Sequence, residues 1–243
     1  MLVLYSDFGI DDPYLGQMKA ALLRHGQREV PMIDLLHRVP DFDARAGAHL
    51  LAALQTSFAA GSVFLAVVDP GVGSDRPAVV VEADEKWYVG PDNGLLAVLA
   101  ARAQALRTWR ITWRPDGLST SFHGRDLFAP IAARIAAGVW PAEALAASAG
   151  LDHRMAADDL AEVIYIDHYG NAFTGLRAAN ITREARLAVG RAQIPAARVF
   201  AAVPCGQAFW YENSVGLVEI AVNRGSAAAD LRLAVGSPVA LVT

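Results

Sequence analysis

Over its first 150 residues the chain alternates short apolar runs with longer segments of helical periodicity. Apolar runs of four to eight residues between turn residues are typical of buried strands, and apolar positions three or four apart are typical of helices. Strands and helices in alternation predict a parallel α/β sheet. The predicted strands are 2–5, 32–36, 63–68, 77–83, 86–89 and 106–113, with 77–83 and 86–89 forming a hairpin. The predicted helices are 13–25, 43–60, 94–103 and 126–137, followed by a further helix that Pro141 opens.

From about residue 161 onward the pattern changes to short β-type runs separated by turn residues, which is typical of a small all-β domain. The polar stretch 153–159 provides a connection between the two patterns. We therefore predict a mostly parallel α/β sandwich domain over residues 1–155 and a smaller, β-barrel-like domain over residues 156–243. The predicted strands of the second domain are 163–166, 172–176, 186–189, 215–222 and 239–242.

Composition and charge narrow the classes of function. The 243 residues are 54% hydrophobic, enough for a large core, and the formal net charge of -4 supplies no basic field for nucleic acid. The single cysteine, Cys205, excludes an internal disulfide and a Cys-based zinc cluster. No apolar run approaches the roughly 18 residues of a membrane-spanning helix, and the first residues lack the basic start of a signal peptide. We expect a cytoplasmic protein with neither nucleic-acid nor membrane partners.

Three polar islands interrupt the apolar pattern of the first domain. They are residues 69–73 with Arg76, residues 90–94, and residues 122–126. The first island directly follows the predicted strand 63–68, and an open α/β sheet places its ligand crevice where strands end. Asp69, Arg76 and His123 thus bring an acid, a cation and a base to one candidate site. Each also has a plain structural interpretation, since aspartates cap tight turns and a lone histidine is usually structural.

Nucleotide and metal motifs are absent from the sequence. Gly71 and Gly73 are not followed by the third glycine of a dinucleotide fingerprint, and no stretch matches a phosphate loop. The six histidines show no paired helical spacing beside a glutamate. We expect neither a cofactor nor a metal ion.

Taken together with residues 6–9, 167–171 and 213–219, the islands resemble one known family in order and spacing. This is the S-adenosylmethionine (SAM) hydrolase family, also called the SAM hydroxide adenosyltransferases, which are relatives of fluorinase and chlorinase. The resemblance implies that SAM and water are converted to adenosine and L-methionine. It also implies a homotrimer whose sites lie between one subunit's large domain and the neighbour's small domain.

The resemblance further implies roles for individual residues. Asp69, Arg76 and His123 match the Asp-Arg-His set of the hydrolases, with Asp7 holding the ribose hydroxyls and Phe42 lying beside the sugar. Residues expected at the methionine end or the adenine are Asp167, Asn171 and Ser214, with Tyr169 packing on the base and Asp12 joining the methionine contacts. The complete set expected to bind substrate is Asp7, Asp12, Phe42, Phe122, Asp167, Tyr169, Asn171 and Ser214. Departures from the family pattern are Ser6 and Ser121, where threonine is common, and Val215, which replaces a polar residue near the carboxylate in fluorinase.

Two other functions compete with hydrolysis. A halogenase of this family carries tyrosine where Asp69 stands, and a carboxylate repels halide by about 4 kcal/mol at 4 Å for an effective dielectric constant of 20. A protein that binds SAM or adenosine without turnover would use the same pocket. For hydrolysis, we expect Asp69 and His123 to position water in line with the C5'–S bond, and either residue is a candidate acceptor of its proton.

Overall fold

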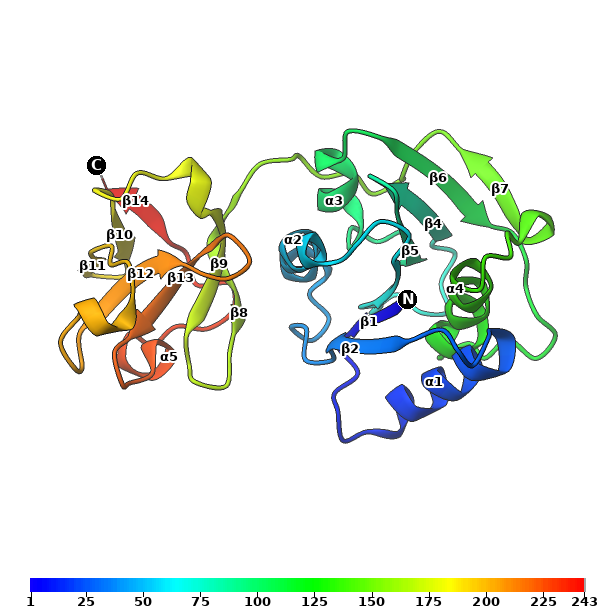
Figure 1. Ribbon diagram of the computed structural model, residues 1–243, viewed down its shortest axis with the longest axis horizontal. Coiled ribbons are helices and arrows are strands. Elements are labelled where there is room, and N and C mark those ends of the chain that lie inside the picture. Colours follow the sequence, from blue (N-terminus) through cyan, green and yellow to red (C-terminus); the bar gives the residue numbers. More distant parts are fainter. Residues whose placement is uncertain (243) are drawn as a thin grey trace. The chain divides into compact units, whose positions relative to one another are not determined.

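The computed structural model describes residues 1–242, which form two compact units (Figure 1). The first unit comprises Met1–Leu51 and Phe58–Ala157, and the second comprises Ala52–Ser57 and the chain from Asp158 onward. None of the helices within the described residues is long and apolar enough to cross a membrane.

A seven-stranded sheet forms the first unit, with strand order β2-β1-β3-β5-β4-β6-β7. The pairs β1/β2, β1/β3 and β3/β5 are parallel, whereas β4/β5, β4/β6 and β6/β7 are antiparallel. The predicted α/β fold class is confirmed, and the sheet is mixed because the hairpin β4–β5 reverses the chain direction. The strands are β1 (Leu2–Ser6), β2 (Met32–Leu36), β3 (Val63–Val67), β4 (Ala78–Ala83), β5 (Lys86–Pro91), β6 (Leu106–Ile111) and β7 (Leu145–Ser148).

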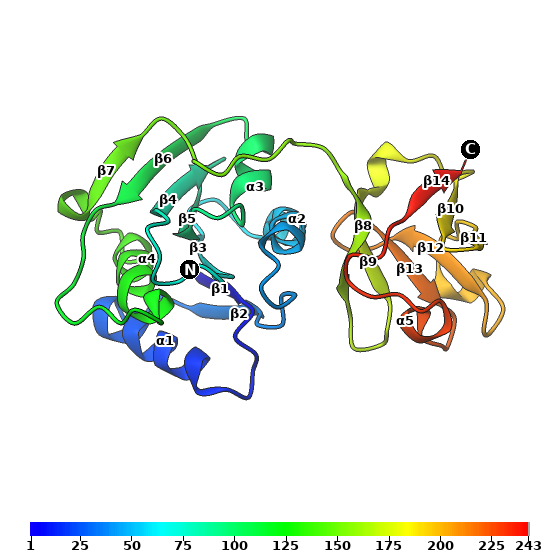
Figure 2. The ribbon, with the colours of Figure 1, turned by 180° about the vertical axis from the view of Figure 1, so that it is seen from behind.

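Helices cover both faces of this sheet (Figures 1 and 2). On one face, Met18 of α1 and Ile131 of α4 pack into a buried cluster with Leu4 and Leu65 of the central strands. On the other face, the Tyr5 hydroxyl donates to a backbone carbonyl of α2. The helical segments are α1 (Pro13–His25), α2 (Ala44–Leu54), η1 (Gln55–Ser57), α3 (Ala97–Arg102), the π-helical turn η2 (Gly124–Phe128), α4 (Ala129–Ala136) and η3 (Ala142–Ala144).

Three predicted helices of the first unit differ from the structure. The helix expected to run to residue 60 ends at Leu54 and continues only as the 3₁₀ turn η1. The helix expected after Pro141 is a single 3₁₀ turn followed by β7, because the backbone of this segment pairs with the edge strand β6. The helix expected from residue 94 begins at Ala97. Gly94 has a φ of +103°, and the Asn93 side chain holds the preceding turn by accepting from the Leu95 N–H.

The second unit consists of two antiparallel sheets with strand orders β12-β13-β9-β8 and β11-β10-β14. Apolar side chains of both sheets, among them Val163, Leu187, Trp210 and Ile220, share one buried cluster. The predicted strands all occur, whereas β11 and β12 were not predicted. The elements are β8 (Leu160–Ile166), β9 (Ala172–Arg177), η4 (Ala178–Asn180), β10 (Arg186–Val189), β11 (Ala192–Ile194), η5 (Phe200–Ala202), β12 (Ala208–Glu212), β13 (Leu217–Val222), α5 (Ala227–Asp230) and β14 (Ala240–Val242).

Candidate active site

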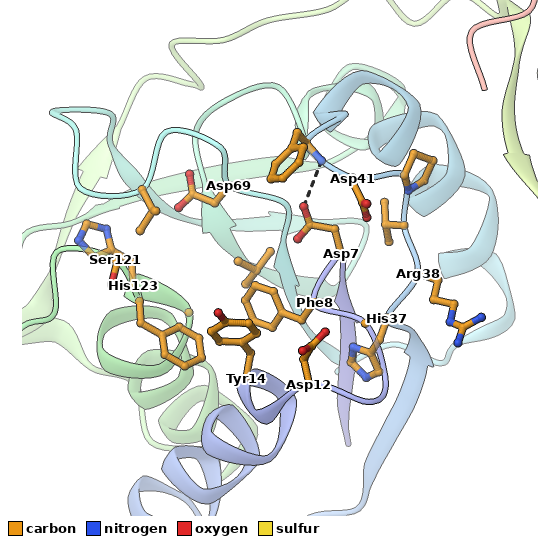
Figure 3. A pocket seen from close by; sticks show the side chains of 18 residues that line it. Asp7, Phe8, Asp12, Tyr14, His37, Arg38, Asp41, Asp69, Ser121 and His123 are labelled. Carbon is orange, nitrogen blue, oxygen red and sulfur yellow. Dashed lines mark hydrogen bonds between the residues drawn. The ribbon is translucent and has the colours of Figure 1, made fainter. Parts of the chain in front are cut away.

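A cavity of about 830 Å³ opens in the first unit where the parallel strands end (Figure 3). Asp7 follows β1, His37 follows β2 and Asp69 follows β3, so the carboxyl ends of three adjacent parallel strands supply one wall. Ser121 and His123, from the loop before η2, line it as well. The fold therefore brings Asp7, Asp69 and His123 to a common hollow.

Asp69, Arg76 and His123 form a contiguous cluster. Arg76 Nε donates to Asp69 Oδ1 at 2.6 Å, and its Nη2 donates to Asp69 Oδ2, which makes the pair bidentate. The same Nη2 lies 3.3 Å from Nδ1 of His123. The side chains of Arg76 and Asp69 are only 7% and 5% exposed, and the guanidinium lies over the Phe128 ring. Asp69 and His123 line the cavity and Arg76 does not, so Arg76 braces both of them from behind.

Arg76 also determines the protonation of His123. A guanidinium donates hydrogen bonds and accepts none, so Nδ1 of His123 is the acceptor, and the neutral ring carries its proton on Nε2. Burial lowers the pKa of His123, and the neighbouring Arg76 charge lowers it further, against an opposing effect of Asp69. The ring is therefore a neutral Nε2–H donor at neutral pH.

Close backbone packing places the loop of Asp69 against the loop of His123. Gly73 has a φ of +82°, and a Cβ added to it would lie 2.4 Å from the Thr120 carbonyl oxygen. The Asn93 side chain donates to the Val68 carbonyl at 2.8 Å, immediately before Asp69. Asn93, which belongs to the second polar island, thus holds the backbone next to Asp69 in place.

Asp92, from the same island, has a structural role. Its buried carboxylate accepts from the backbone N–H groups of Asp152 and His153. The turn at residues 90–94 therefore ties β5 to the end of the first unit.

Asp7 lies on the same side of the cavity as the β2–α2 loop. Its Oδ2 accepts the Phe42 N–H at 3.2 Å. Burial raises the pKa of the Asp7 carboxyl, the Phe42 hydrogen bond opposes this, and the charges of Asp41 and Asp69 raise it again. Phe42 has a φ of +62°, and the residue is 73% exposed. Its backbone N–H donates to Asp7, while its ring is accessible to a ligand.

The remaining predicted residues of the first unit also line this cavity. Asp12 lies at the start of α1, and Phe122 packs edge-on against Phe8 and Tyr14 with ring centroids 5.7 and 5.6 Å apart. All the residues predicted there except Arg76 thus face one hollow.

A second cavity, of about 690 Å³, lies in the second unit, and Asp167, Tyr169, Asn171 and Ser214 all line it. Asp167 Oδ1 accepts the backbone N–H groups of Tyr169 and Asn171 at 3.0 and 2.8 Å, which shapes the turn between β8 and β9. Tyr169 is 68% exposed. The predicted substrate-binding residues therefore divide between two cavities, one in each unit.

Sequence reasoning did not single out Glu219, which lines the second cavity and is 3% exposed. Tyr211 Oη and Asn213 Nδ2 donate to its carboxylate. Burial raises the pKa of Glu219, these hydrogen bonds lower it, and the charge of Asp167 raises it. The sequence feature that could have identified Glu219 is an acidic residue within the otherwise apolar strand Leu217–Val222.

The first cavity contains further residues that the sequence did not indicate. These are Tyr14, His37 and Asp41. No local motif marks them: Tyr14 lies at the start of α1, and His37 and Asp41 lie in the loop between β2 and α2. No group of three or more histidine, cysteine or acidic side chains suited to a metal ion occurs among residues 1–242.

Comparison with known proteins identifies the family of the chain. The family model described as the SAM hydroxide adenosyltransferase N-terminal domain matches residues 2–146, and that of the C-terminal domain matches residues 161–240. An (R)-S-adenosyl-L-methionine hydrolase from Thermus thermophilus is 38% identical, over 98% of this chain and 97% of the relative. One from Salinispora arenicola is 37% identical, over 92% and 90%. A fluorinase from Nocardia brasiliensis is more distant, at 24% identity over 98% and 95%.

Solved structures share the fold. The crystal structure of an uncharacterized conserved protein from Thermotoga maritima matches with a TM-score of 0.90 and 28% identity over all of both chains. That of a conserved hypothetical protein from Thermus thermophilus matches with a TM-score of 0.79 and 36% identity over 99% of both chains.

Proposed function

This chain belongs to the SAM hydroxide adenosyltransferase family, as its motifs predicted, and we propose that it hydrolyses S-adenosyl-L-methionine to adenosine and L-methionine. The observation that carries the proposal is the Asp69–Arg76–His123 cluster, of which Asp69 and His123 line a cavity shared with Asp7. The hydrolases named above specify the R configuration, so we take the (R) epimer as the preferred substrate.

The reaction needs an aligned nucleophile and no general acid. The oxygen of water forms a bond to C5' as the C5'–S bond breaks, and the electron pair of that bond neutralises the sulfonium to a thioether. Water loses one proton. The protein's contribution is to hold water in line with the breaking bond and to accept that proton.

The tautomer of His123 indicates which residue performs each of these two tasks. With Nδ1 accepting from Arg76, the Nε2–H donates to the water oxygen and has no lone pair with which to take its proton. Asp69 retains carboxylate lone pairs that Arg76 does not use. We therefore assign proton acceptance to Asp69 and orientation of the water to His123.

Substrate binding in the first cavity is assigned to Asp7, Asp12, Phe42 and Phe122. Asp7 accepts hydrogen bonds from the two ribose hydroxyls, which fixes C5' toward the water. Phe42 offers an exposed ring beside the sugar. Phe122 packs edge-on against two further rings and so forms an apolar wall of the cavity. To Asp12, which also lines the cavity, we assign a contact with the methionine part of the substrate.

The methionine and adenine ends are assigned to Asp167, Tyr169, Asn171 and Ser214 of the second cavity. Since each unit carries part of the set, we propose a homotrimer in which residues 1–155 of one subunit meet residues 156–243 of its neighbour.

We place the protein in the cytoplasm, where its exposed, unpaired Cys205 suits a reducing environment.

The test incubates the purified protein with each sulfonium epimer of SAM and separates the products by chromatography. Equal amounts of adenosine and methionine from the (R) epimer are expected. Binding without adenosine release would make the protein a sensor and overturn the proposal. A 5'-halo-adenosine formed on addition of chloride or fluoride would make it a halogenase, which the Asp69 carboxylate disfavours.

A further inference from the structure

Four side chains form a continuous hydrogen-bonded chain beside the first cavity, and the function proposed above uses none of them. Lys19 Nζ donates to Asp34 Oδ2 at 2.6 Å. Asp34 Oδ1 lies 3.1 Å from Nε2 of His37, whose Nδ1 lies 2.8 Å from Ser6 Oγ. Ser6 is fully buried and His37 is 3% exposed, whereas Lys19 and Asp34 are partly exposed. The chain thus leads from the partly exposed Lys19 and Asp34 to the buried His37, which lines the cavity, and Ser6.

The ion pair of Lys19 and Asp34, at the partly exposed end of the chain, determines which groups donate and which accept. Partial burial acts to raise the pKa of Asp34, but the hydrogen bonds from Lys19 and His37 outweigh it and hold the pKa below its usual value. Asp34 is therefore an acceptor and His37 Nε2–H is its donor, while His37 Nδ1 is hydrogen-bonded to the Ser6 hydroxyl. Both ring nitrogens are occupied, so His37 has none left for a substrate although it lines the cavity.

The inner end of the chain joins two loops. Besides the Ser6–His37 contact, the Gly9 N–H donates to the His37 carbonyl at 2.7 Å, and the Val39 N–H donates to the Ser6 carbonyl at 3.2 Å. Ser6 Oγ also accepts the Phe8 N–H at 3.4 Å, which closes the turn that presents Asp7. His37 and Asp7 lie on the same side of the cavity (Figure 3).

The joined loops provide both the Asp7 carboxylate and the groups around it. Beyond Val39 the second loop carries Asp41 and Phe42, and the Phe42 N–H is the donor that Asp7 receives. Burial is the largest cause of the raised pKa of Asp7, and the negative charges of Asp41 and Asp69 raise it further. Burial and nearby like charges both disfavour the ionised form of a carboxyl group, so the contacts between the two loops hold the Asp7 carboxylate in place against this cost.

We propose that His37 is a positioning residue that holds Asp7 in ribose-binding geometry by joining the β1–α1 loop to the β2–α2 loop through Ser6 and Asp34. The inference rests on the function proposed above in that it takes the sugar of SAM and adenosine as the ligand of Asp7.

A double-mutant cycle tests it, with adenosine as the probe and affinity measured by calorimetry. His37→Ala in the otherwise wild-type protein is expected to raise the adenosine Kd by about tenfold, the size of one hydrogen bond to a charged group. In the Asp7→Ala background the same change is expected to leave the Kd within about twofold, because the group that His37 positions is gone. An equal loss in both backgrounds would overturn the proposal.

Two further variants separate positioning from general destabilisation. Ser6→Ala removes only the hydroxyl and is expected to weaken adenosine binding in the same direction, and it replaces His37→Ala if that variant does not fold. Thr108→Val deletes a comparably buried hydrogen bond between β6 and β7, away from the cavity. It is expected to lower the melting temperature and to leave the adenosine Kd unchanged. A matching loss of affinity in Thr108→Val would attribute the effect to stability and contradict the role of His37.

Failure of this inference is distinguishable from failure of the proposed function. If the wild-type protein binds adenosine but does not hydrolyse SAM, hydrolysis is excluded and the cycle still decides the role of His37. If hydrolysis occurs and the cycle is additive, the function stands and His37 is not a positioning residue.

Discussion

At the scale of single residues, Arg76 connects the two side chains to which we assign the handling of water in the proposed site, Asp69 and His123. Its planar fork binds both oxygens of Asp69, and one of its nitrogens also donates to His123. A lysine ammonium is a point donor on a flexible stem and does not reproduce this arrangement. The relative position of base and water donor therefore depends on the shape of the guanidinium as well as on its charge.

Arg76→Lys should consequently lower kcat roughly 10- to 100-fold, the effect of losing one or two hydrogen bonds to a charged group. The KM for SAM should change little, since Arg76 does not line the cavity. Steady-state kinetics of adenosine formation measure both values. A rise in KM with unchanged kcat would contradict the bracing role.

Asp69 and Asp7 are both carboxylates at strand ends, and their proposed roles differ. Asp69→Asn keeps the size of the side chain but removes the proton acceptor, so kcat should fall by roughly 10²- to 10⁴-fold with little change in adenosine affinity. Asp7→Asn should instead raise the adenosine Kd about tenfold or more. Parallel kinetics and calorimetry on the two variants check this, and identical profiles would contradict the division of roles.

The lowered pKa of His123 has a consequence for stability. The unfolded chain takes up a proton near pH 6.5 more readily than the folded protein does, so the contribution of His123 is unimpaired above that pH and declines as pH falls below it. Between pH 7.5 and 5.5 the wild type should lose more stability than His123→Asn. Urea unfolding at both pH values measures the difference, and a larger loss in the variant would contradict the direction of the shift.

At the scale of elements, a strand end and a helix entrance bring the cluster together. Asp69 follows the parallel strand β3, whereas His123 directly precedes the π-helical turn η2. Asp126 in that turn accepts the Ser119 N–H and pairs with Arg125, which braces the loop that carries His123. A π-helical turn is uncommon and often occurs at functional sites.

The approach of these two loops depends on Gly73. Alanine at this position would have to adopt a left-handed backbone conformation, which side chains with a Cβ rarely do. Its Cβ would also lie 2.4 Å from the Thr120 carbonyl oxygen, so the two loops would have to move apart. Gly73→Ala should lower kcat about 10- to 100-fold by displacing Asp69 from His123. The matched control is Gly71→Ala in the same loop, where the added Cβ meets nothing closer than 3.5 Å. Equal kinetics for the two variants would show that the close approach is unimportant.

At the scale of the whole molecule, the predicted substrate residues occupy two cavities, one in each compact unit. In the proposed homotrimer a complete site takes its first cavity from one subunit and its second from the neighbour. Two inactive variants with changes in different units should then complement each other.

Coexpression of Asp69→Ala with Asn171→Ala should restore about a quarter of wild-type hydrolysis, because three in four randomly assembled trimers then contain one intact site of three. Light scattering should show a particle of three chains. Asp69→Ala with His123→Ala serves as the control, since both changes lie in the first unit and no mixed trimer regains a complete site. No recovery in the first mixture would contradict sites shared between subunits.

How far the sequence predicts the molecule depends on the range of the interactions involved. The helix over Pro13–His25 follows from its own apolar spacing, and the hairpin β4–β5 from its two-residue turn. The segment after Pro141 was predicted wrongly, because pairing with β6 decides its conformation. The missed strand β12 likewise exists through its pairing with β13.

The sequence by itself determined the alternation of elements, the fold class and the family, because apolar periodicity and ordered motifs are properties of consecutive residues. Only the tertiary structure decided which nitrogen of His123 carries the proton, since Arg76 lies 47 positions away along the chain. It alone joined Ser6, at the end of β1, to His37, which follows β2 and is hydrogen-bonded to Asp34 of that strand. Chemistry that depends on donor direction and on atoms a few ångströms apart arises from long-range packing, which no local pattern encodes.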